Sequence, residues 1–346
     1  MTDQLWPRLR SVGRWVSQRR RELTLAGAAA LVGLLALEIG GRWHEARIRR
    51  LPFLHDAEQR FYPRLHHGLR GYRPGATNVL LLGGSTLERI RAPLWNAQHP
   101  GWRFHNVSLK AHTSLDSRYK YEYLLRKGFR FDFVVFYHGI NDTRTNNVPP
   151  ALFDPDYGHY AFYRMAHTIF RDRGSLRSLV VRSSYLGYSL ELLYRLRPAQ
   201  EGMLPPGPPP KEWKPFGAEI KSREPFRRNL VRISELARAA GSRLVVPLFA
   251  YYHPEDYSFE AWTRREVGRR CGNPGDPPHI WGYPPNVVRG IREHNRAIEE
   301  ERSRFILVDT ADISGVAEHF CDICHFSTAG AELFVEKVLG AIEKPR

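Results

Sequence analysis

The stretch NVLLLGGSTLE, residues 78–88, indicates the fold class of this chain. Its first part, Asn78 to Leu82, is a short apolar run, as expected of a parallel strand buried on both faces. Gly83, Gly84 and Ser85 follow directly, where the chain must turn before a helix begins. A buried strand that leads through a glycine turn into a helix predicts one unit of a parallel α/β sheet.

The same alternation continues on both sides of this stretch. Further strands are predicted at residues 102–109, 131–137, 243–249 and 304–309, and helices at 114–127, 224–240, 287–303 and 329–342. Strands that alternate with helices imply a parallel sheet with helices on both faces.

Two segments interrupt the alternation. Residues 144–222 contain no convincing strand, but they include a helix candidate at 183–196 and the proline run PPGPPP at 205–210. Residues 251–283 are rich in proline, glycine and aromatic residues. Both segments follow predicted strand ends, where an open α/β sheet places its ligand. We interpret them as substrate-side loops or a lid, although surface segments without a role would look the same.

The N-terminal region predicts a membrane anchor. Residues 1–22 form a basic leader with six arginines, and residues 23–41 are apolar apart from Thr24 and Glu38. A spanning helix needs about 20 such residues. We therefore expect a transmembrane anchor at 23–41 and a connector at 42–76; a signal-peptide core or a buried soluble helix are the alternatives. Four arginines follow the span, so the charge bias only modestly favours a cytoplasmic N-terminus.

Composition limits the class of partner. The chain has 346 residues, 42% of them hydrophobic, and a net charge of +16 from 52 Lys plus Arg against 36 Asp plus Glu. Such a charge suits nucleic acid or an anionic membrane surface. No nucleic-acid-binding module is recognisable, so we expect no nucleic-acid partner. The three cysteines are too few for a disulfide scaffold, and their odd number leaves a free thiol unless one pairs between chains.

Three short motifs carry candidate chemistry. Ser85 follows a buried strand, where its hydroxyl lies at the sheet edge and its N–H can point at a developing oxyanion. Asn141, in HGIND at 138–142, can donate its amide N–H into the same cleft. Asn-Asp is also typical of turns and helix caps, and such a structural role alone is the alternative for Asp142. Asp322 and His325, in CDICHFSTAG, lie three residues apart, so the carboxylate can fix the imidazole that deprotonates a serine.

Each motif alone is compatible with an ordinary turn, but their order and spacing resemble the SGNH hydrolases, also called the GDSL family. Gly83-Gly84-Ser85 resembles the family's serine block, with Gly84 in place of the usual Asp. Gly139-x-Asn141-Asp142 and Asp322-x-x-His325 match the third and last blocks. The second block resembles residues 106–114, where Ala111 stands at the usual glycine. The resemblance covers residues 76–143 and 224–342.

The resemblance implies a flavodoxin-like three-layer α/β/α sandwich with a parallel sheet at residues 77–346, carrying the insertion 144–222, in addition to the N-terminal transmembrane helix. It implies a catalytic triad of Ser85, Asp322 and His325. The oxyanion hole would comprise the N–H groups of Ser85 and Ala111 and the side chain of Asn141. The methyl group of Ala111 is expected to crowd this site or to alter its backbone angles. No cofactor and no metal are expected.

The resemblance further implies a serine ester hydrolase that acts through an acyl-serine intermediate. An O-acyl (acetyl) esterase for carbohydrate or envelope polysaccharide is the expected function. A polysaccharide O-acyltransferase with the same triad and an inactive binding module are the alternatives. We expect a single-pass protein of the inner membrane, held in the lipid bilayer by residues 23–41, with a periplasmic catalytic domain. Its substrate would be an acylated carbohydrate or another small ester.

The cysteine motif leaves further alternatives open. Cys321, Cys324 and His325 form a C-x-x-C-H pattern, which is also the attachment pattern of c-type haem. Both cysteines with His319 or His325 would supply part of a zinc site. A disulfide between Cys321 and Cys324, or from either to Cys271, is favoured in an oxidising compartment. Three other histidines that could line the cleft are more typical of structural positions: His112, His138 and His253.

Overall fold

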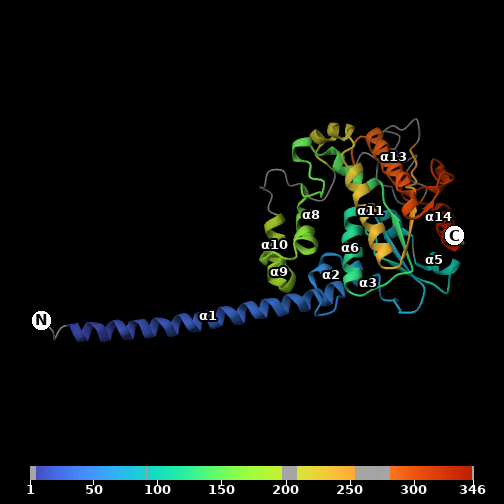
Figure 1. The fold of residues 1–346 in the computed structure, drawn as a ribbon. Helices are drawn as coiled ribbons and strands as arrows, with labels where there is room; N and C mark the ends of the chain where they lie inside the picture. The colour runs from blue at the N-terminus through green and yellow to red at the C-terminus, as the bar shows by residue number, and fades with distance from the viewer. Residues whose placement is uncertain (1–4, 91, 197–208, 254–270, 272–280, 345–346) are drawn as a thin grey trace.

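Five parallel strands form the sheet of this chain in the computed structural model (Figure 1). They are β1 (Asn78–Gly83), β2 (Arg103–Asn106), β3 (Phe133–Tyr137), β4 (Arg243–Pro247) and β5 (Ile306–Val308), in the order β2-β1-β3-β4-β5. This order is the flavodoxin-like one, and it reverses direction between β1 and β3, where such sheets bind ligands. The structure describes residues 5–90, 92–196, 209–253, 271 and 281–344.

Helices cover both faces of this sheet, as the sequence predicted. One face packs against α6 (Ser114–Arg126) and α11 (Arg223–Ala239), and the other against α5 (Ala92–Gln98) and α14 (Thr328–Glu343). Figure 1 shows α6 and α11 on the near side of the sheet. Leu80 and Leu82 point into the first core, and Val79 and Leu81 into the second. This alternation explains why the whole strand is apolar.

The remaining helices join the strands or extend from them. They are α2 (Ala57–Phe61), α3 (Arg64–His67), α4 (Ser85–Arg89), α7 (Ile140–Thr143), α8 (Ala161–Ala166), α9 (Leu176–Ser183), α10 (Tyr185–Leu196) and α13 (Pro284–Glu300). Short 3₁₀ segments are η1 (Arg144–Asn147), η2 (Pro150–Leu152), η4 (Lys211–Ala218), η6 (Arg302–Arg304) and η7 (Ala317–His319), and η3 (His167–Arg171) is a π-helical turn. The helices predicted at 114–127, 183–196, 224–240, 287–303 and 329–342 are thus confirmed within a few residues.

A single long helix, α1 (Leu5–Arg49), extends from the domain (Figure 1). Residues 19–49 of this helix are long and apolar enough to cross a membrane, a property that a signal sequence shares. Its large apolar side chains between Leu23 and Ile39 are mostly exposed, so the protein itself does not bury them. The helix also continues into the segment that we had assigned to the connector, residues 42–76.

The insertion 144–222 has two parts in the structure. Its ends, η1 and η4, pack together beside the carboxyl end of β3. Its middle contains α9 and α10, and α10 packs against α1 (Figure 1). The interpretation of the whole insertion as a lid therefore does not hold for α9 and α10. The proline run 205–210 and most of 251–283 lie outside the described residues.

Candidate active site

Three side chains from distant parts of the chain meet at the carboxyl end of β1. Ser85 opens α4 directly after this strand, and Asp322 and His325 lie in the loop before α14. His325 Nε2 lies 2.8 Å from Ser85 Oγ, and His325 Nδ1 lies 2.5 Å from Asp322 Oδ2. Asp322 and His325 are buried, whereas Ser85 is partly exposed. The arrangement places a base between a carboxylate and a hydroxyl that a substrate can reach.

The loop that carries His325 is shaped by Asp322 itself. Asp322 Oδ1 accepts hydrogen bonds from the backbone N–H groups of Cys324 (2.9 Å) and His325 (2.8 Å). A short aspartate side chain closes this kind of turn well. The Cys321 N–H donates to the His325 carbonyl at 2.7 Å and closes the loop from the other side. One carboxylate thus fixes both the backbone and the imidazole of the histidine.

Burial and neighbouring charge act in opposite directions on these groups. Burial alone would lower the pKa of His325, but the Cys324 sulfur and the Asp322 carboxylate next to Nδ1 outweigh it, and the pKa is raised. Burial alone would raise the pKa of Asp322, but its hydrogen bond and charge interaction with His325 lower it. Asp322 therefore stays ionised and keeps a proton on Nδ1, which leaves Nε2 to face the serine.

Asn141 lies close behind the serine turn. Its Nδ2 donates a hydrogen bond to the His112 carbonyl at 2.8 Å, so the amide joins the end of β3 to the loop after β2. A Cβ atom on Gly84 would overlap Asn141 Nδ2 far inside 3.0 Å, and would also approach the His112 carbonyl at 3.3 Å. There is no room for a side chain here, which gives a physical reason for glycine at position 84. An amide nitrogen carries two N–H donors, and this hydrogen bond uses one of them.

Ala111 lies in the same loop after β2, with a φ of 62°. This left-handed conformation is costly for alanine and easy for glycine. Ala111 thus has a backbone conformation that glycine adopts more easily, and the effect of its methyl group on the site stays a prediction. The loop is held at its start by Lys120 Nζ, which donates to the Val107 carbonyl at 2.7 Å. It is held at its end by the Thr113 N–H, which donates to Asp116 Oδ2 at 2.7 Å.

Asp142 has the structural role that was considered for it. Its carboxylate accepts hydrogen bonds from Ser114 Oγ (2.6 Å), from the Ser114 N–H and from the Tyr157 hydroxyl (3.0 Å). It thereby caps the first turn of α6 and connects it to the segment after β3. Burial raises the pKa of Asp142 to about 6, although the Ser114 hydrogen bonds oppose this shift.

Two of the histidines that could have lined the cleft are buried structural residues. The His138 Nε2 lies 2.6 Å from Ser117 Oγ, and the His112 ring packs against Tyr62. Burial lowers the pKa of each to about 3, so both are neutral.

No protein-family model and no curated protein matches this chain. Several solved structures do. A GDSL-like lipase from Bacteroides thetaiotaomicron matches with 13% identity over 83% of this chain and 98% of its own, at a TM-score of 0.44. An acetylxylan esterase from Geobacillus stearothermophilus matches with 14% identity over 78% and 95%, at 0.39. A member of the lipolytic G-D-S-L family from Veillonella parvula matches with 12% identity over 78% and 100%, at 0.40.

The structure shows the sheet order and the position of each motif at a strand end independently of these matches. The architecture is a flavodoxin-like parallel sheet with helices on both faces. The serine, the Gly-x-Asn-Asp block and the Asp-x-x-His block all lie at one edge of the sheet, in the arrangement that the sequence resemblance implied. Such an arrangement equips the site for acyl transfer from an ester.

Two of the three cysteines pair in one of the ways left open. Cys271 and Cys321 form a disulfide, and Cys324 is a buried free thiol. Cys321 is therefore not available to the haem attachment pattern or to the zinc set that we considered. Ligand atoms of Asp322, Cys324 and His325 do lie within 4.8 Å of one another. Asp322 and His325 Nδ1 already bind each other in this group, so a metal there would displace the contact that orients the histidine.

Sequence reasoning missed two residues beside the triad. Cys324 Sγ lies 3.8 Å from His325 Nδ1, and Arg89 Nη1 lies 3.9 Å from Asp322 Oδ2. Arg89 is four residues after Ser85 on α4, so helical spacing could have indicated that it lies on the same face. The guanidinium is half-exposed and adds positive charge next to the buried carboxylate.

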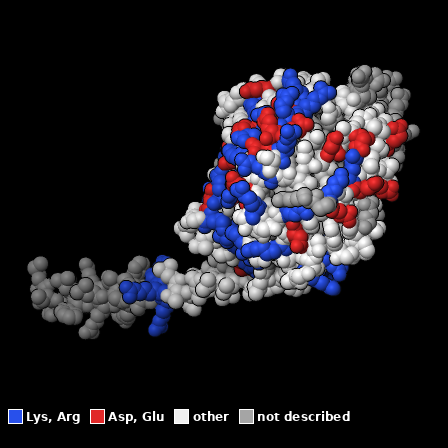
Figure 2. Space-filling view, turned by 45° about the vertical axis from the view of Figure 1, so that its right-hand side comes forward, with Lys and Arg blue, Asp and Glu red and all other residues white. Residues whose placement is uncertain are grey.

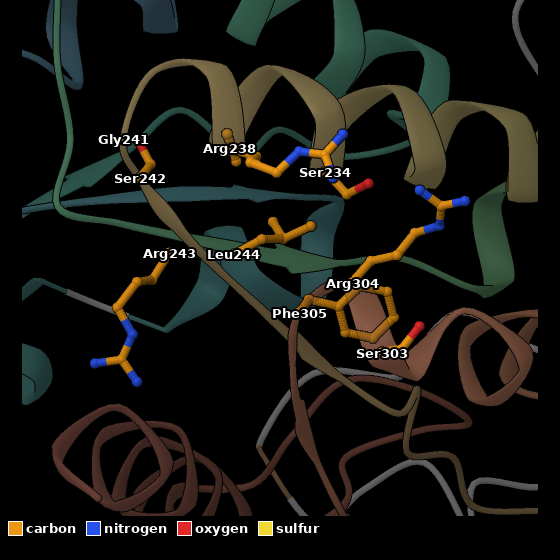
Figure 3. A pocket seen from close by; sticks show the side chains of 10 residues that line it. Ser234, Arg238, Gly241, Ser242, Arg243, Leu244, Ser303, Arg304 and Phe305 are labelled. Atoms are coloured by element: carbon orange, nitrogen blue, oxygen red, sulfur yellow. The ribbon is translucent and has the colours of Figure 1, made fainter. Parts of the chain in front are cut away.

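The structure also has a hollow that is unrelated to this site. It measures about 960 Å³ and lies where β4 begins, between Arg238, Arg243 and Arg304 (Figure 3). This is the amino end of the strand, opposite the edge where the triad lies. No triad residue lines it. The volume of this hollow therefore does not indicate where the catalytic residues lie.

Proposed function

We propose that this chain is a serine ester hydrolase in which Ser85 forms an acyl-enzyme. The proposal rests on one observation above all: His325 contacts Ser85 Oγ at 2.8 Å through Nε2 while Asp322 holds its Nδ1. His325 takes the proton of Ser85 Oγ as this oxygen attacks the ester carbonyl. It then gives that proton to the departing alcohol, and water enters by the same route to release the acid.

The negative charge that develops on the carbonyl oxygen needs donors on the other side of Ser85. We assign this role to the N–H groups of Ser85 and Ala111 and to the second N–H of Asn141. Removal of one such donor costs about 3–4 kcal/mol of transition-state stabilisation in serine hydrolases. The close packing of Gly84, Asn141 and His112 supports this role, because it fixes the amide without a bulky neighbour.

The substrate class that we propose is an acylated carbohydrate of the cell envelope. The support is the family resemblance together with α1, whose exposed apolar length suits a membrane anchor. We propose that the basic leader stays in the cytoplasm and that the domain faces outward. The Cys271–Cys321 disulfide suits an oxidising compartment. Alkaline phosphatase fused after Arg346 should be active; an inactive fusion beside an active cytoplasmic reporter would reject this topology.

Hydrolysis and transfer differ only in what attacks the acyl-serine. The full chain in detergent should release p-nitrophenol from p-nitrophenyl acetate, and we expect this release without a sugar acceptor. Turnover that requires an added sugar would instead identify an O-acyltransferase. A folded protein that releases nothing in either condition, and does not acylate Ser85, would be a binding module.

A further inference from the structure

The helices α9 and α10 present apolar side chains that the domain does not cover. Leu176 is 77% exposed, Leu190 is 66% exposed and Leu193 is 63% exposed, and Leu179 and Val180 are exposed as well. A shallow groove of about 510 Å³ between the two helices is lined by several of them. A gathered patch of exposed leucines in a folded domain usually marks a contact surface.

This pair of helices is attached directly to α1. Glu38 accepts hydrogen bonds from the N–H groups of Tyr185 (2.7 Å) and Leu186 (3.0 Å), at the start of α10. Arg42 Nη2 donates to the Ser183 carbonyl at 2.9 Å, at the end of α9. The Tyr185 ring packs so closely on Gly41 that a Cβ there would overlap it. The apolar patch is therefore fixed next to the end of the candidate membrane span.

The patch also lies on the correct side of the domain to meet a membrane. Figure 1 shows α9 and α10 on the side of the domain from which α1 extends, whereas α14 lies on the opposite side. A bilayer crossed by the exposed apolar part of α1 would thus face α9 and α10. Because the exposed apolar surface of α1 lies next to that of α9 and α10, we expect both surfaces to contact the same lipid.

Basic side chains surround a hollow at the base of α9. It measures about 460 Å³, and its cations are Arg126, Lys127, Arg173 and Arg182, against the two acids Asp56 and Glu58. Arg173 and Arg182 both approach Glu58, at 2.5 and 3.5 Å. Burial lowers the pKa of Arg126, and the charge of the adjacent Arg173 adds to this shift. Figure 2 shows Lys and Arg along the side of the domain from its top down to α1, with Asp and Glu among them in the upper part.

We propose that α9 and α10, together with this basic hollow, form a second contact with the bilayer that seats the domain on anionic lipid. The leucines enter the interfacial region, and the arginines at the base of α9 bind lipid phosphate. Helices with an apolar face and nearby Lys or Arg bind membranes in this way. The inference rests on the proposed anchoring by α1, and its test separates the two.

The test uses the full chain in lipid nanodiscs with one added cysteine. Leu193→Cys carries an environment-sensitive NBD label, and Glu336→Cys on α14 carries the same label as the matched control. Both positions are exposed, while Cys324 is buried and Cys271 and Cys321 are bonded to each other. Discs contain either phosphatidylcholine alone or an equal mixture with phosphatidylglycerol, each with a spin-labelled quencher lipid.

We expect quenching of the label at position 193, stronger with phosphatidylglycerol, and none at position 336. Leu176→Ser with Leu190→Ser should abolish this quenching, and Arg126→Gln with Arg173→Gln should abolish its dependence on phosphatidylglycerol. Co-elution with the discs but no quenching at 193 would overturn the second contact alone. Quenching that ignores phosphatidylglycerol would overturn the phosphate part. If the protein did not co-elute with the discs, the proposed membrane anchor would be rejected, and the second contact with the bilayer would be rejected with it.

Discussion

Replacement of Gly84 by alanine should reduce the activity of the enzyme much more than the stability of the fold. The new Cβ would overlap Asn141 Nδ2, so this amide must retreat by about 1 Å to reach ordinary van der Waals contact. The retreat breaks the 2.8 Å hydrogen bond from Asn141 to the His112 carbonyl. A buried polar group left unpaired costs about 1–3 kcal/mol, which bounds the fall in the free energy of unfolding.

The effect on activity should be larger than this fall suggests. A displacement of about 1 Å at a catalytic group can reduce the rate about 10²-fold. We therefore expect kcat/KM for p-nitrophenyl acetate to fall about 10²-fold in Gly84→Ala, while thermal unfolding remains cooperative. Gly71→Ala is the matched control, since a Cβ at Gly71 meets nothing within 4 Å. Wild-type kcat/KM in folded Gly84→Ala would refute the oxyanion role of Asn141.

Four further outcomes follow from the same geometry. Ser85→Ala, His325→Ala and the double variant should lose activity to a similar degree, because a triad acts as a unit; an unimpaired Ser85→Ala enzyme would end the proposal. Asn141→Ala should lower kcat by about 10²–10³ with little change in Tm; a large fall in Tm at retained specific activity would make Asn141 a cap. The neutral form of His325 is the base and its pKa is raised, so kcat/KM should fall with decreasing pH along a limb centred above pH 6.5; a limb centred below 6.5 would contradict this assignment. Cys321→Ser should keep activity but lose about 2–4 kcal/mol of stability, because it opens a loop of 50 residues; an unchanged Tm would argue against this disulfide.

The sequence predicted the sheet well because its strands are locally distinctive. NVLLL at 78–82 became β1, and the strands predicted at 131–137 and 243–249 became β3 and β4. The strand at 102–109 was predicted too long, because Ser108 already turns back to Asn106, whose Oδ1 accepts the Ser108 N–H. Periodicity records which face of an element is buried, but it does not show where a turn begins.

The contacts that complete the site and the domain could not be predicted in this way. The close approach of Asn141 to Gly84 and the pairing of Cys271 with Cys321 join residues far apart in the sequence. The attachment of α10 to Glu38 was missed for the same reason, because an isolated acid in an apolar run gives no sign of its partner. The position of residues 144–222 after a predicted strand end suggested substrate-side loops or a lid, whereas in the structure α10 packs against α1.

Because α1 is one unbroken helix, it would limit the distance from the membrane at which the domain can act. The helix continues for eight residues beyond Gly41, about 12 Å, and Glu38 and Arg42 attach it to the domain. If α1 anchors the chain as proposed, this rigid helix would hold the domain at one height above the membrane, whereas a flexible linker would let the height vary. Esters at other distances from the membrane would have to move to the site. The length of α1 would therefore select among esters that are chemically identical.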